Sequence, residues 1–274
     1  MENSDERLAE NRGYDIKKAH THFSKIARRY NDLRITDTAP ITFIKNKLKN
    51  LKKIEMADIG CGVGRYDIEL FRCLGDKLNL TCIDTNERML DALVENMEKH
   101  NISRFKVIKS PAEKLPLPDN SLDCMVTFNA IHHFVLSDFL DKVSCCLKNN
   151  GYLFIYTRLR SQNKRSIWGK YFPGFHEKET LLYELEEIEN ILNDIMALKL
   201  ESVEYFHYRR KSSLEELVTQ AGHNHYSTFY LHYEPEEFER ALEGFQDNIK
   251  RHFENTYDII WDNEMTMLVV RKSK

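Results

Sequence analysis

The sequence predicts an α/β protein with a mostly parallel sheet, because short apolar segments alternate with segments of helical periodicity. Strands joined by helices or long crossovers pair in parallel through right-handed connections. Ligands of such sheets bind beyond the carboxyl ends of the strands, and the motifs described below fall mostly at those ends. The five candidate strands are residues 54–59, 78–84, 105–108, 122–128 and 152–157.

The rest of the chain is expected to surround this core within one domain of 274 residues. Helices at 15–31 and from Pro40 to Leu51 make residues 1–52 an N-terminal helical cover, followed by a ligand-binding core at 53–157. Residues 158–274 are expected to hold a substrate-side insertion and the final strands. Its elements are a helix at 177–197, a strand at 200–208, helices at 213–221 and 235–253, and a last strand at 265–271.

Composition restricts the class of protein. Hydrophobic residues make up 42% of the chain and charged residues 30%, which indicates a globular protein and argues against disorder. The net charge of −3 lacks the basic character of bulk nucleic-acid binding, and no apolar run reaches the roughly 18–20 residues of a membrane helix. The first residues are acidic and polar, unlike a secretory signal.

The six cysteines are scattered and include no C-x-x-C pair, so we expect neither a zinc site nor any other metal site. Cys145 and Cys146 are adjacent in a helical stretch, where two small buried residues are a simpler interpretation than soft-metal chemistry. This cysteine usage suits a reducing, cytoplasmic location.

The most informative motif is a glycine turn between the first strand and its helix, Asp58-Ile59-Gly60-Cys61-Gly62-Val63-Gly64-Arg65. Strand, glycine turn and helix together let the backbone approach a nucleotide closely. The spacing is D-x-G-x-G-x-G, whereas dinucleotide-binding folds use G-x-G-x-x-G. Close approach without a pyrophosphate cradle suits a nucleoside, which points to S-adenosylmethionine (SAM) rather than NAD.

Two further segments complete a nucleoside site. Asp84 ends the second strand, beside Thr85, and its carboxylate can accept both ribose hydroxyls. The alternative for Asp84 is an acid at a helix N-terminus or in a solvated turn. The segment from Ser110 to Asp123 lies where the adenine edge is expected, although it also reads simply as a proline-rich turn.

From Asp58 to Thr157 the chain resembles the class I SAM-dependent methyltransferases, in the subgroup that includes ubiquinone/menaquinone C-methyltransferases and many small-molecule methyltransferases. The resemblance covers 100 of 274 residues and implies a Rossmann-like, mostly parallel seven-stranded sheet with helices on both faces. It rests on the order and spacing of five segments: the glycine turn, Cys82-Ile83-Asp84 with Met89-Leu90, Ala112-Glu113-x-Leu115-Pro116, Ser121-Leu122-Asp123, and Asn149-Asn150-Gly151-Tyr152. The last match is partial, because the family often has two glycines where this chain has Gly151 alone.

The resemblance implies a role for individual residues. Gly60, Gly62 and Gly64 would face the methionine moiety, with Asp58 orienting the turn or the amino-acid end of SAM. Asp84 would hold the ribose, Ala112 and Glu113 would border the adenine, and Phe128 and Asn129 would line the sulfonium side. Tyr30 resembles a tyrosine that closes over the ligand in this subgroup. One departure is Pro111, which stands where the family often has an acid; it lacks both a carboxylate and an N–H, so polar contact to adenine must come from Glu113 or the Ala112 N–H.

Candidate catalytic residues follow the fourth strand. The sulfonium methyl of SAM is already activated, so a base is needed only where the acceptor atom carries a proton. His132 and His133 are the nearest candidates, since an imidazole with a near-neutral pKa suits base work. The alternative is that they only pack or hydrogen-bond at the start of the next helix. His20 and His22, on the predicted covering helix, are weaker candidates.

The substrate side is predicted to lie beyond the fifth strand. Arg158 and Arg160 leave the strand end, and Trp168, Tyr171 and Phe172 could wall a pocket for an acceptor with a carboxylate or phosphate and an apolar body. A surface loop with a packing aromatic cluster is the alternative. Arg209, Arg210, His225, Tyr226 and Tyr230 fall in the later insertion, and the sequence does not choose among them.

The function predicted from these patterns is SAM-dependent methyl transfer to a small-molecule acceptor, with neither membrane nor nucleic acid as a partner. A methyltransferase acting on tRNA or protein is the second hypothesis, disfavoured because phosphate-backbone binding needs clustered Lys and Arg. A non-enzymatic SAM-binding protein is the third.

Overall fold

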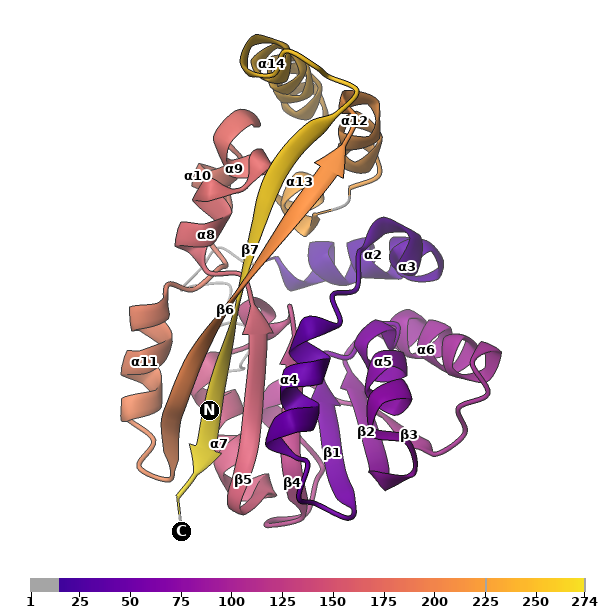
Figure 1. The fold of residues 1–274 in the computed structure, drawn as a ribbon, viewed down its shortest axis with the longest axis vertical. Coiled ribbons are helices and arrows are strands. Elements are labelled where there is room, and N and C mark those ends of the chain that lie inside the picture. Colours follow the sequence, from indigo (N-terminus) through magenta and orange to yellow (C-terminus); the bar gives the residue numbers. More distant parts are fainter. Residues whose placement is uncertain (1–14, 225, 274) are drawn as a thin grey trace.

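The computed structural model describes residues 15–224 and 226–273 and has a seven-stranded sheet with the order β3-β2-β1-β4-β5-β7-β6 (Figure 1). The strands β1 to β5 pair in parallel, and β7 is antiparallel to both of its neighbours. The predicted mostly parallel, seven-stranded sheet is therefore confirmed. The strands are β1 Ile54–Ile59, β2 Leu78–Asp84, β3 Phe105–Lys109, β4 Leu122–Phe128, β5 Leu147–Thr157, β6 Leu198–Ser212 and β7 Ile259–Lys272.

Helices cover both faces of the sheet, because side chains of the central strands are buried on both sides. On one face, Met125 and Ile155 pack with apolar residues of α7 (Leu136–Cys146) and α11 (Leu185–Asn193). On the other face, neighbouring residues of the same strands pack against α4 (Ala39–Lys47), α5 (Arg65–Leu74) and α6 (Glu87–Lys99).

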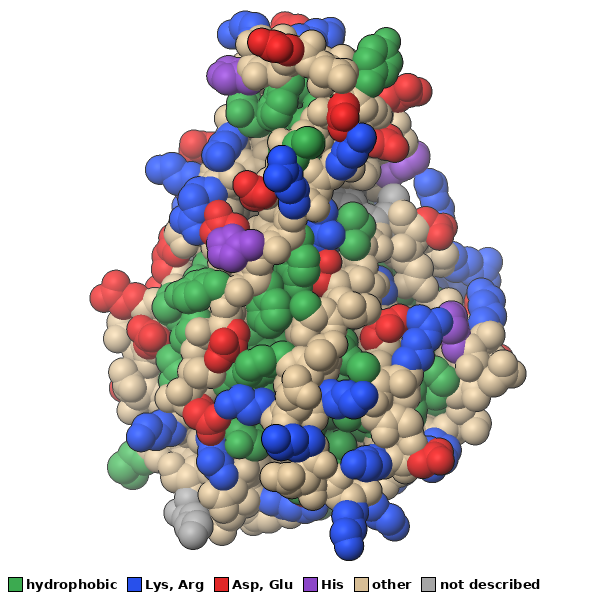
Figure 2. Space-filling model, viewed as in Figure 1, with side chains coloured by type: hydrophobic (Ala, Val, Ile, Leu, Met, Phe, Trp, Pro, Cys, Tyr) green, Lys and Arg blue, Asp and Glu red, His purple; other side chains and the backbone are tan. Residues whose placement is uncertain are grey.

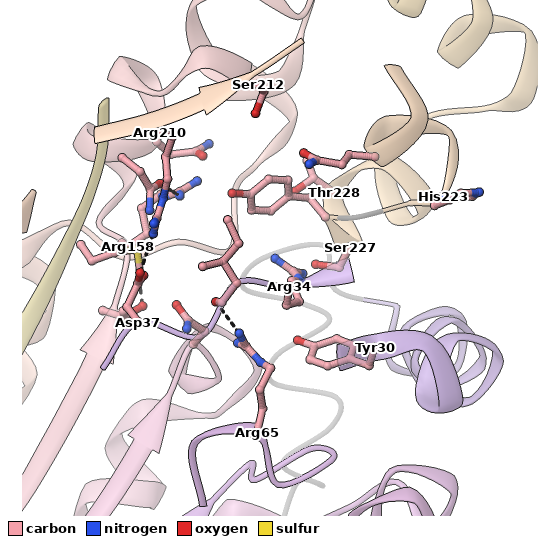
Figure 3. Close-up of a pocket in the computed structure, with 18 of the residues that line it drawn as sticks. Tyr30, Arg34, Asp37, Arg65, Arg158, Arg210, Ser212, His223, Ser227 and Thr228 are labelled. Atoms are coloured by element: carbon pink, nitrogen blue, oxygen red, sulfur yellow. Dashed lines mark hydrogen bonds and ion pairs between the residues drawn. The ribbon is translucent and has the colours of Figure 1, made fainter. Parts of the chain in front are cut away.

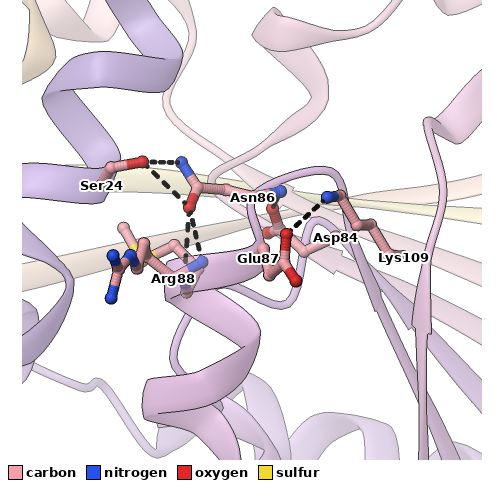
Figure 4. A network of polar contacts seen from close by, with 7 residues as sticks. Ser24, Asp84, Asn86, Glu87, Arg88 and Lys109 are labelled. Atoms are coloured by element: carbon pink, nitrogen blue, oxygen red, sulfur yellow. Dashed lines mark hydrogen bonds and ion pairs between the residues drawn. The ribbon is translucent and has the colours of Figure 1, made fainter.

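Of the predicted N-terminal cover, α2 (Ile16–Ile26), a 3-10 turn at Ala27–Arg29 and α3 (Tyr30–Leu33) lie over the carboxyl ends of the parallel strands (Figure 1). The helix expected from Pro40 to Leu51 does not cover these ends, because α4 packs against a face of the sheet. Asn86 joins this cover to the core. Its side chain caps α6 by accepting from the N–H groups of Arg88 and Met89, and its amide donates to the carbonyl of His20 and the hydroxyl of Ser24, both at 3.0 Å (Figure 4).

A separate lobe rises beyond the sheet on the arm formed by β6 and β7. Pairing of β5 with β7 ends at Thr157 and Thr266, whereas β6 and β7 continue together to Ser212 and Ile259. The lobe has its own aromatic core, centred on Trp168 and Phe245, whose rings stack 5.1 Å apart. Its helices are α8 Arg160–Arg165, α9 Ile167–Tyr171, α10 Phe175–Lys178, α12 Leu214–Gly222, α13 Ser227–His232 and α14 Pro235–His252.

Several details differ from the sequence-based expectation. The strand β5 begins at Leu147 rather than at residue 152, and the helix expected at 15–31 is divided into α2, a 3-10 turn and α3. The helix expected at 177–197 is interrupted, because α10 ends at Lys178 and a capping box begins α11: the Glu184 N–H donates to the Glu187 carboxylate at 2.6 Å. The helix α13 was not expected. Both β6 and β7 are longer than the predicted strands at 200–208 and 265–271, because they pair with each other outside the main sheet.

The surface agrees with the small net charge. On the face shown in Figure 2, acidic and basic side chains are interspersed, and Lys and Arg gather mainly at the lower end, away from the carboxyl ends of the strands. None of the helices in the described ranges has both the length and the apolar character needed to cross a bilayer.

Candidate functional site

Two cavities open at the carboxyl ends of the parallel strands. The first, of about 410 Å³, is formed where β1, β2, β3 and β4 end, and α2 and Tyr30 cover it. Its lining includes Asp58, Gly60, Gly62, Asp84, Thr85, Ala112, Glu113, Phe128, Asn129 and Tyr30. Ten of the eleven residues predicted to bind the cofactor thus line this cavity, whereas Gly64 lies beside it at the start of α5 without lining it.

The glycine turn brings backbone rather than side chains to this cavity. Gly60 and Gly62 have φ values of 72° and 56°, in the left-handed region that favours glycine. A Cβ on Gly60 would lie 2.5 Å from the Cβ of Ala130, whereas one on Gly62 would meet nothing within 4 Å. The N–H groups of Gly60 and Cys61 donate to the Ile83 carbonyl at 2.8 and 3.1 Å, which fastens the turn to β2.

Asp84 lies at the floor of the first cavity, where backbone donors hold its carboxylate. Its Oδ2 accepts from the Gly62 N–H at 2.9 Å and its Oδ1 accepts from the Asn86 N–H at 2.8 Å. Burial nevertheless raises its pKa above the ordinary value. Each carboxylate oxygen has two lone-pair sites, so the group retains acceptor capacity for a diol while its orientation is fixed.

Two buried carboxyl groups lie behind the glycine turn. Asp58, near the end of β1, lines the first cavity, and Asp67 approaches Asp58 from the first turn of α5. The exposed fractions of Asp58 and Asp67 are 2% and 0%. Burial and the neighbouring Asp67 carboxyl raise the pKa of Asp58 well above its ordinary value, and burial raises the pKa of Asp67 to about 6. Two neighbouring buried carboxyl groups do not both ionise easily, which favours the protonated form of at least one of them.

On the side expected for adenine, Ala112 is buried and Glu113 is already engaged. The Glu113 Oε1 accepts from the Val135 N–H at 2.7 Å, which ties the 3-10 turn Ala112–Lys114 to the start of α7. Because Pro111 offers neither a carboxylate nor an N–H, the two candidates for polar contact to adenine are Glu113 and the Ala112 N–H. The hydrogen bond that Glu113 already accepts from Val135 favours the Ala112 N–H.

The second cavity, of about 520 Å³, adjoins the first and extends toward the upper lobe (Figure 3). The two cavities share six lining residues, which come from the N-terminal cover, the start of α5 and the end of β4: Phe23, Tyr30, Arg65, Tyr66, Asn129 and His133. Tyr66 stacks on Phe128 with ring centroids 4.2 Å apart, and burial raises the pKa of Tyr66 to about 12. The junction thus has an aromatic wall, with the Arg65 guanidinium 4.8 Å from the centroid of the Tyr66 ring.

Both predicted catalytic histidines lie at this junction, on the 3-10 turn Ile131–His133. His133 lines both cavities and His132 lines the second; their ring centroids are 4.1 Å apart. Burial, followed by the charges of His132, His22 and Arg34, lowers the pKa of His133 well below its ordinary value. This lowering favours the neutral imidazole, which can accept a proton, and also makes His133 a weaker base than an ordinary histidine.

The two weaker histidine candidates, His20 and His22, lie in different environments. His20 lines the first cavity. His22 is 1% exposed and stacks on Tyr230 with centroids 4.9 Å apart, and burial lowers its pKa to about 4. His22 lines neither cavity and lies in the packing between α2 and the lobe.

Only some of the residues predicted for the substrate side line the second cavity. Arg158 lines the second cavity, and Arg210 does so while pairing with Asp37 at 2.6 Å. Arg160 lines neither cavity. Trp168, 1% exposed, lies inside the aromatic core of the lobe rather than in a pocket wall, because α9 turns it toward Phe245. His225 lies outside the described residues.

Sequence reasoning missed several residues of the second cavity. Arg34 approaches the rings of Tyr30 and Tyr226 at 5.5 and 4.9 Å, and Asn163 and Asn263 line the same space. None of them lies in a recognisable motif, and they come from distant parts of the chain. Within the described ranges, no group of three or more His, Cys, Asp or Glu side chains could hold a metal ion.

Comparison with known proteins agrees with this geometry. Residues 57–155 match the protein family described as "Methyltransferase domain". This part of the chain belongs to the class I SAM-dependent methyltransferases. SAM is the cofactor of this class, and the fold of the structure is that of its solved members.

Individual relatives match mainly this domain. A demethylmenaquinone methyltransferase of Listeria welshimeri is 27% identical over 112 residues, covering 39% of this chain and 48% of that protein. The phthiotriol/phenolphthiotriol dimycocerosates methyltransferase 1 of Mycobacterium ulcerans is 32% identical over 114 residues, covering 40% of each chain. The chain thus spans about half the length of the curated relatives it matches, or less.

Similarity to solved structures extends over more of the chain than the sequence matches do. A protein of Anabaena variabilis, named as a methyltransferase from an antibiotic biosynthesis pathway, superposes with a TM-score of 0.64 at 22% identity. The superposition covers 86% of this chain and 98% of that chain. At this identity the similarity shows the fold alone.

Proposed function

We propose that this protein transfers the methyl group of SAM to a small-molecule acceptor bound in the second cavity. The observation that carries the proposal is the junction: a cavity lined by the SAM motifs opens into a second cavity, and Asn129 and His133 line both. A cofactor and an acceptor held on either side of such a junction can meet there, with water largely excluded by the surrounding aromatic rings.

The residues of the first cavity fit SAM. We assign the ribose hydroxyls to the remaining lone pairs of Asp84 beside Thr85, and the adenine to Ala112 and Glu113. The methionine moiety would lie on Gly60 and Gly62, where the absence of side chains leaves room for it. The buried pair of Asp58 and Asp67 would compensate a cationic amino group nearby.

The chemistry required of the protein is mainly positioning. SAM supplies an activated methyl group when bound, so the protein must hold the acceptor atom in line with the methyl–sulfur bond, which contributes about 7–11 kcal/mol where the geometry is good. The stacked rings of Tyr66 and Phe128 would face the sulfonium, with the Arg65 guanidinium 4.8 Å from the centroid of the Tyr66 ring. His133 would accept a proton where the acceptor atom carries one.

A small-molecule acceptor agrees with a bounded cavity of about 520 Å³ and with the net charge of −3. The curated relatives named above also act on small molecules according to their names. A cytoplasmic location is part of the proposal and is supported by six cysteines, all free in the structure.

The first test is calorimetric titration with SAM, with NAD as the comparison ligand. Binding of NAD without binding of SAM would overturn the proposal. The second test is a screen with SAM labelled in its methyl group over separate pools of metabolites, RNA and protein. We expect label in the metabolite pool; label only in RNA or only in protein would refute the small-molecule acceptor, and SAM binding without transfer to any pool would indicate a non-enzymatic SAM-binding protein.

A further inference from the structure

We propose that the acceptor carries an oxyanion, a carboxylate or a phosphate, that binds Arg158 in the second cavity close to the site of methyl transfer. This inference rests on the proposed function, because it names the class of molecule that the second cavity accepts. It is carried by a buried cluster of hydrogen-bond donors that lack acceptors in the described part of the chain.

Arg158 is the centre of the cluster. Its side chain lines the second cavity with only 8% of the residue exposed, and its Nη2 donates to the Oδ1 of Asn263. The Nε and Nη1 groups are buried and have no hydrogen-bond partner among the described residues. A guanidinium stays protonated at all relevant pH values, and burial of an uncompensated charge is unfavourable. A ligand that supplies oxygen acceptors would relieve this cost.

Two neighbouring side chains add donors without partners. The Nδ2 of Asn163 is buried in a residue that is 2% exposed, and the Nε of Arg34 is likewise without an acceptor in the described ranges. Arg34 and Arg158 approach the same ring, that of Tyr226, at 4.9 and 5.3 Å from its centroid. Two like charges are therefore held on one aromatic side chain, an arrangement that an anion between them would stabilise. Figure 3 shows Arg34 and Arg158 on the walls of this cavity.

The acidic side chains of the same cavity are already engaged. Asp37 pairs with Arg210 at 2.6 Å. Glu179 accepts from the Thr228 hydroxyl and from the Leu181 N–H. Glu216 accepts from the Ser213 N–H at the start of α12. The two other acids in the lining, Asp32 and Glu215, are solvent-exposed. Among the described residues, no salt bridge joins Arg158 to a carboxylate.

The strand register places this cluster near the transfer site. Asn129 follows β4 and its N–H donates to the Tyr156 carbonyl at 2.7 Å, and Arg158 lies two residues beyond Tyr156 at the end of the adjacent strand β5. Neighbouring strands are about 4.8 Å apart. The oxyanion would therefore bind at the β5 side of the second cavity, where the end of β5 adjoins the end of β4 that leads to Asn129.

The test measures thermal unfolding of the full chain, with SAM present, against sodium phosphate and sodium benzoate at constant ionic strength, with chloride as the reference salt. We expect saturable stabilisation by one of the two anions, and the anion that acts distinguishes a phosphate acceptor from a carboxylate acceptor. Arg158→Gln should weaken this binding at least tenfold, whereas Arg160→Gln, two residues away and outside the cavity, should leave it unchanged. Stabilisation by neither anion beyond chloride, or equal binding by Arg158→Gln, would overturn the inference.

Two further measurements keep the test decisive. SAM titration of each variant separates this inference from the proposed function, because loss of the oxyanion site should leave SAM affinity unchanged. Arg34→Gln, at a half-buried position, serves if Arg158→Gln does not fold, and should weaken anion binding at least threefold. An acceptor identified in the labelled-methyl screen that is neutral or cationic would also refute the inference.

Discussion

Replacing Asp84 with Asn should weaken SAM binding far more than its small change in shape suggests. The carboxylate uses one lone pair of each oxygen for the Gly62 and Asn86 N–H groups, at 2.9 and 2.8 Å, and leaves the others for the ribose hydroxyls. Two charge-assisted hydrogen bonds contribute about 1.5–3 kcal/mol each, whereas the amide can retain at most one neutral bond of about 0.5–1.5 kcal/mol. The net loss is about 2–4 kcal/mol, or a roughly 30- to 700-fold higher Kd.

The assay is calorimetric titration with SAM at pH 7.5, together with thermal unfolding to show that the variant is folded. Asp84→Asn should also lower stability by about 1–3 kcal/mol, because its NH2 group would face a buried backbone N–H. Asp76→Asn is the matched control, since the Asp76 side chain is fully exposed and pairs only at the surface with Arg104 at 2.6 Å. The ribose assignment is wrong if folded Asp84→Asn binds SAM within twofold of the unaltered protein.

Three further predictions concern the same site. Gly60→Ala should lower the free energy of unfolding by about 2–5 kcal/mol, because the new Cβ would overlap Ala130 and the residue has a left-handed φ. Gly62→Ala should lower it by only about 1–2 kcal/mol, because only the left-handed φ opposes the change. Equal losses in urea unfolding would contradict this steric argument. Because the pKa of Asp67 is raised from 3.8 to about 6, the free energy of unfolding without ligand should fall by up to about 3 kcal/mol as pH rises from about 4 to 6. Asp67→Asn should flatten that dependence in urea titrations across the same pH range, and an unaltered slope would exclude Asp67 as its source. His133→Gln should lower kcat about 10²- to 10⁴-fold while SAM affinity stays within twofold; unchanged turnover in the labelled-methyl assay would remove His133 as the base.

Much of the core could be predicted because its signals are local. The strands β1, β2 and β4 have the predicted bounds, since each is a short apolar run closed by turn residues. The glycine turn and Asp84 were recognisable for the same reason: a strand end, a turn and a helix start are consecutive in the chain.

The part of the chain beyond β5 was harder to predict, because its structure depends on partners distant in sequence. The arm of β6 and β7 is extended by mutual pairing, which reaches beyond the apolar runs that identified the two strands. Trp168 was expected in a pocket wall because it is aromatic. The packing of α9 against α14 instead places it in an aromatic core. Aromatic side chains suit both environments, and only the fold around them decides between the two.

The sequence by itself determined that this protein has a SAM-dependent methyltransferase core, because spacing within a few residues sets the conformation of the glycine turn and the position of Asp84. The tertiary structure alone decided what lies opposite the cofactor. Arg34, Arg158 and Tyr226 come from the N-terminal cover, the end of β5 and the upper lobe, and form one cluster only after the sheet and the lobe have packed. Burial then leaves the Nε and Nη1 of Arg158 without acceptors among the described residues, and neither burial nor the lack of these partners can be read from the order of residues.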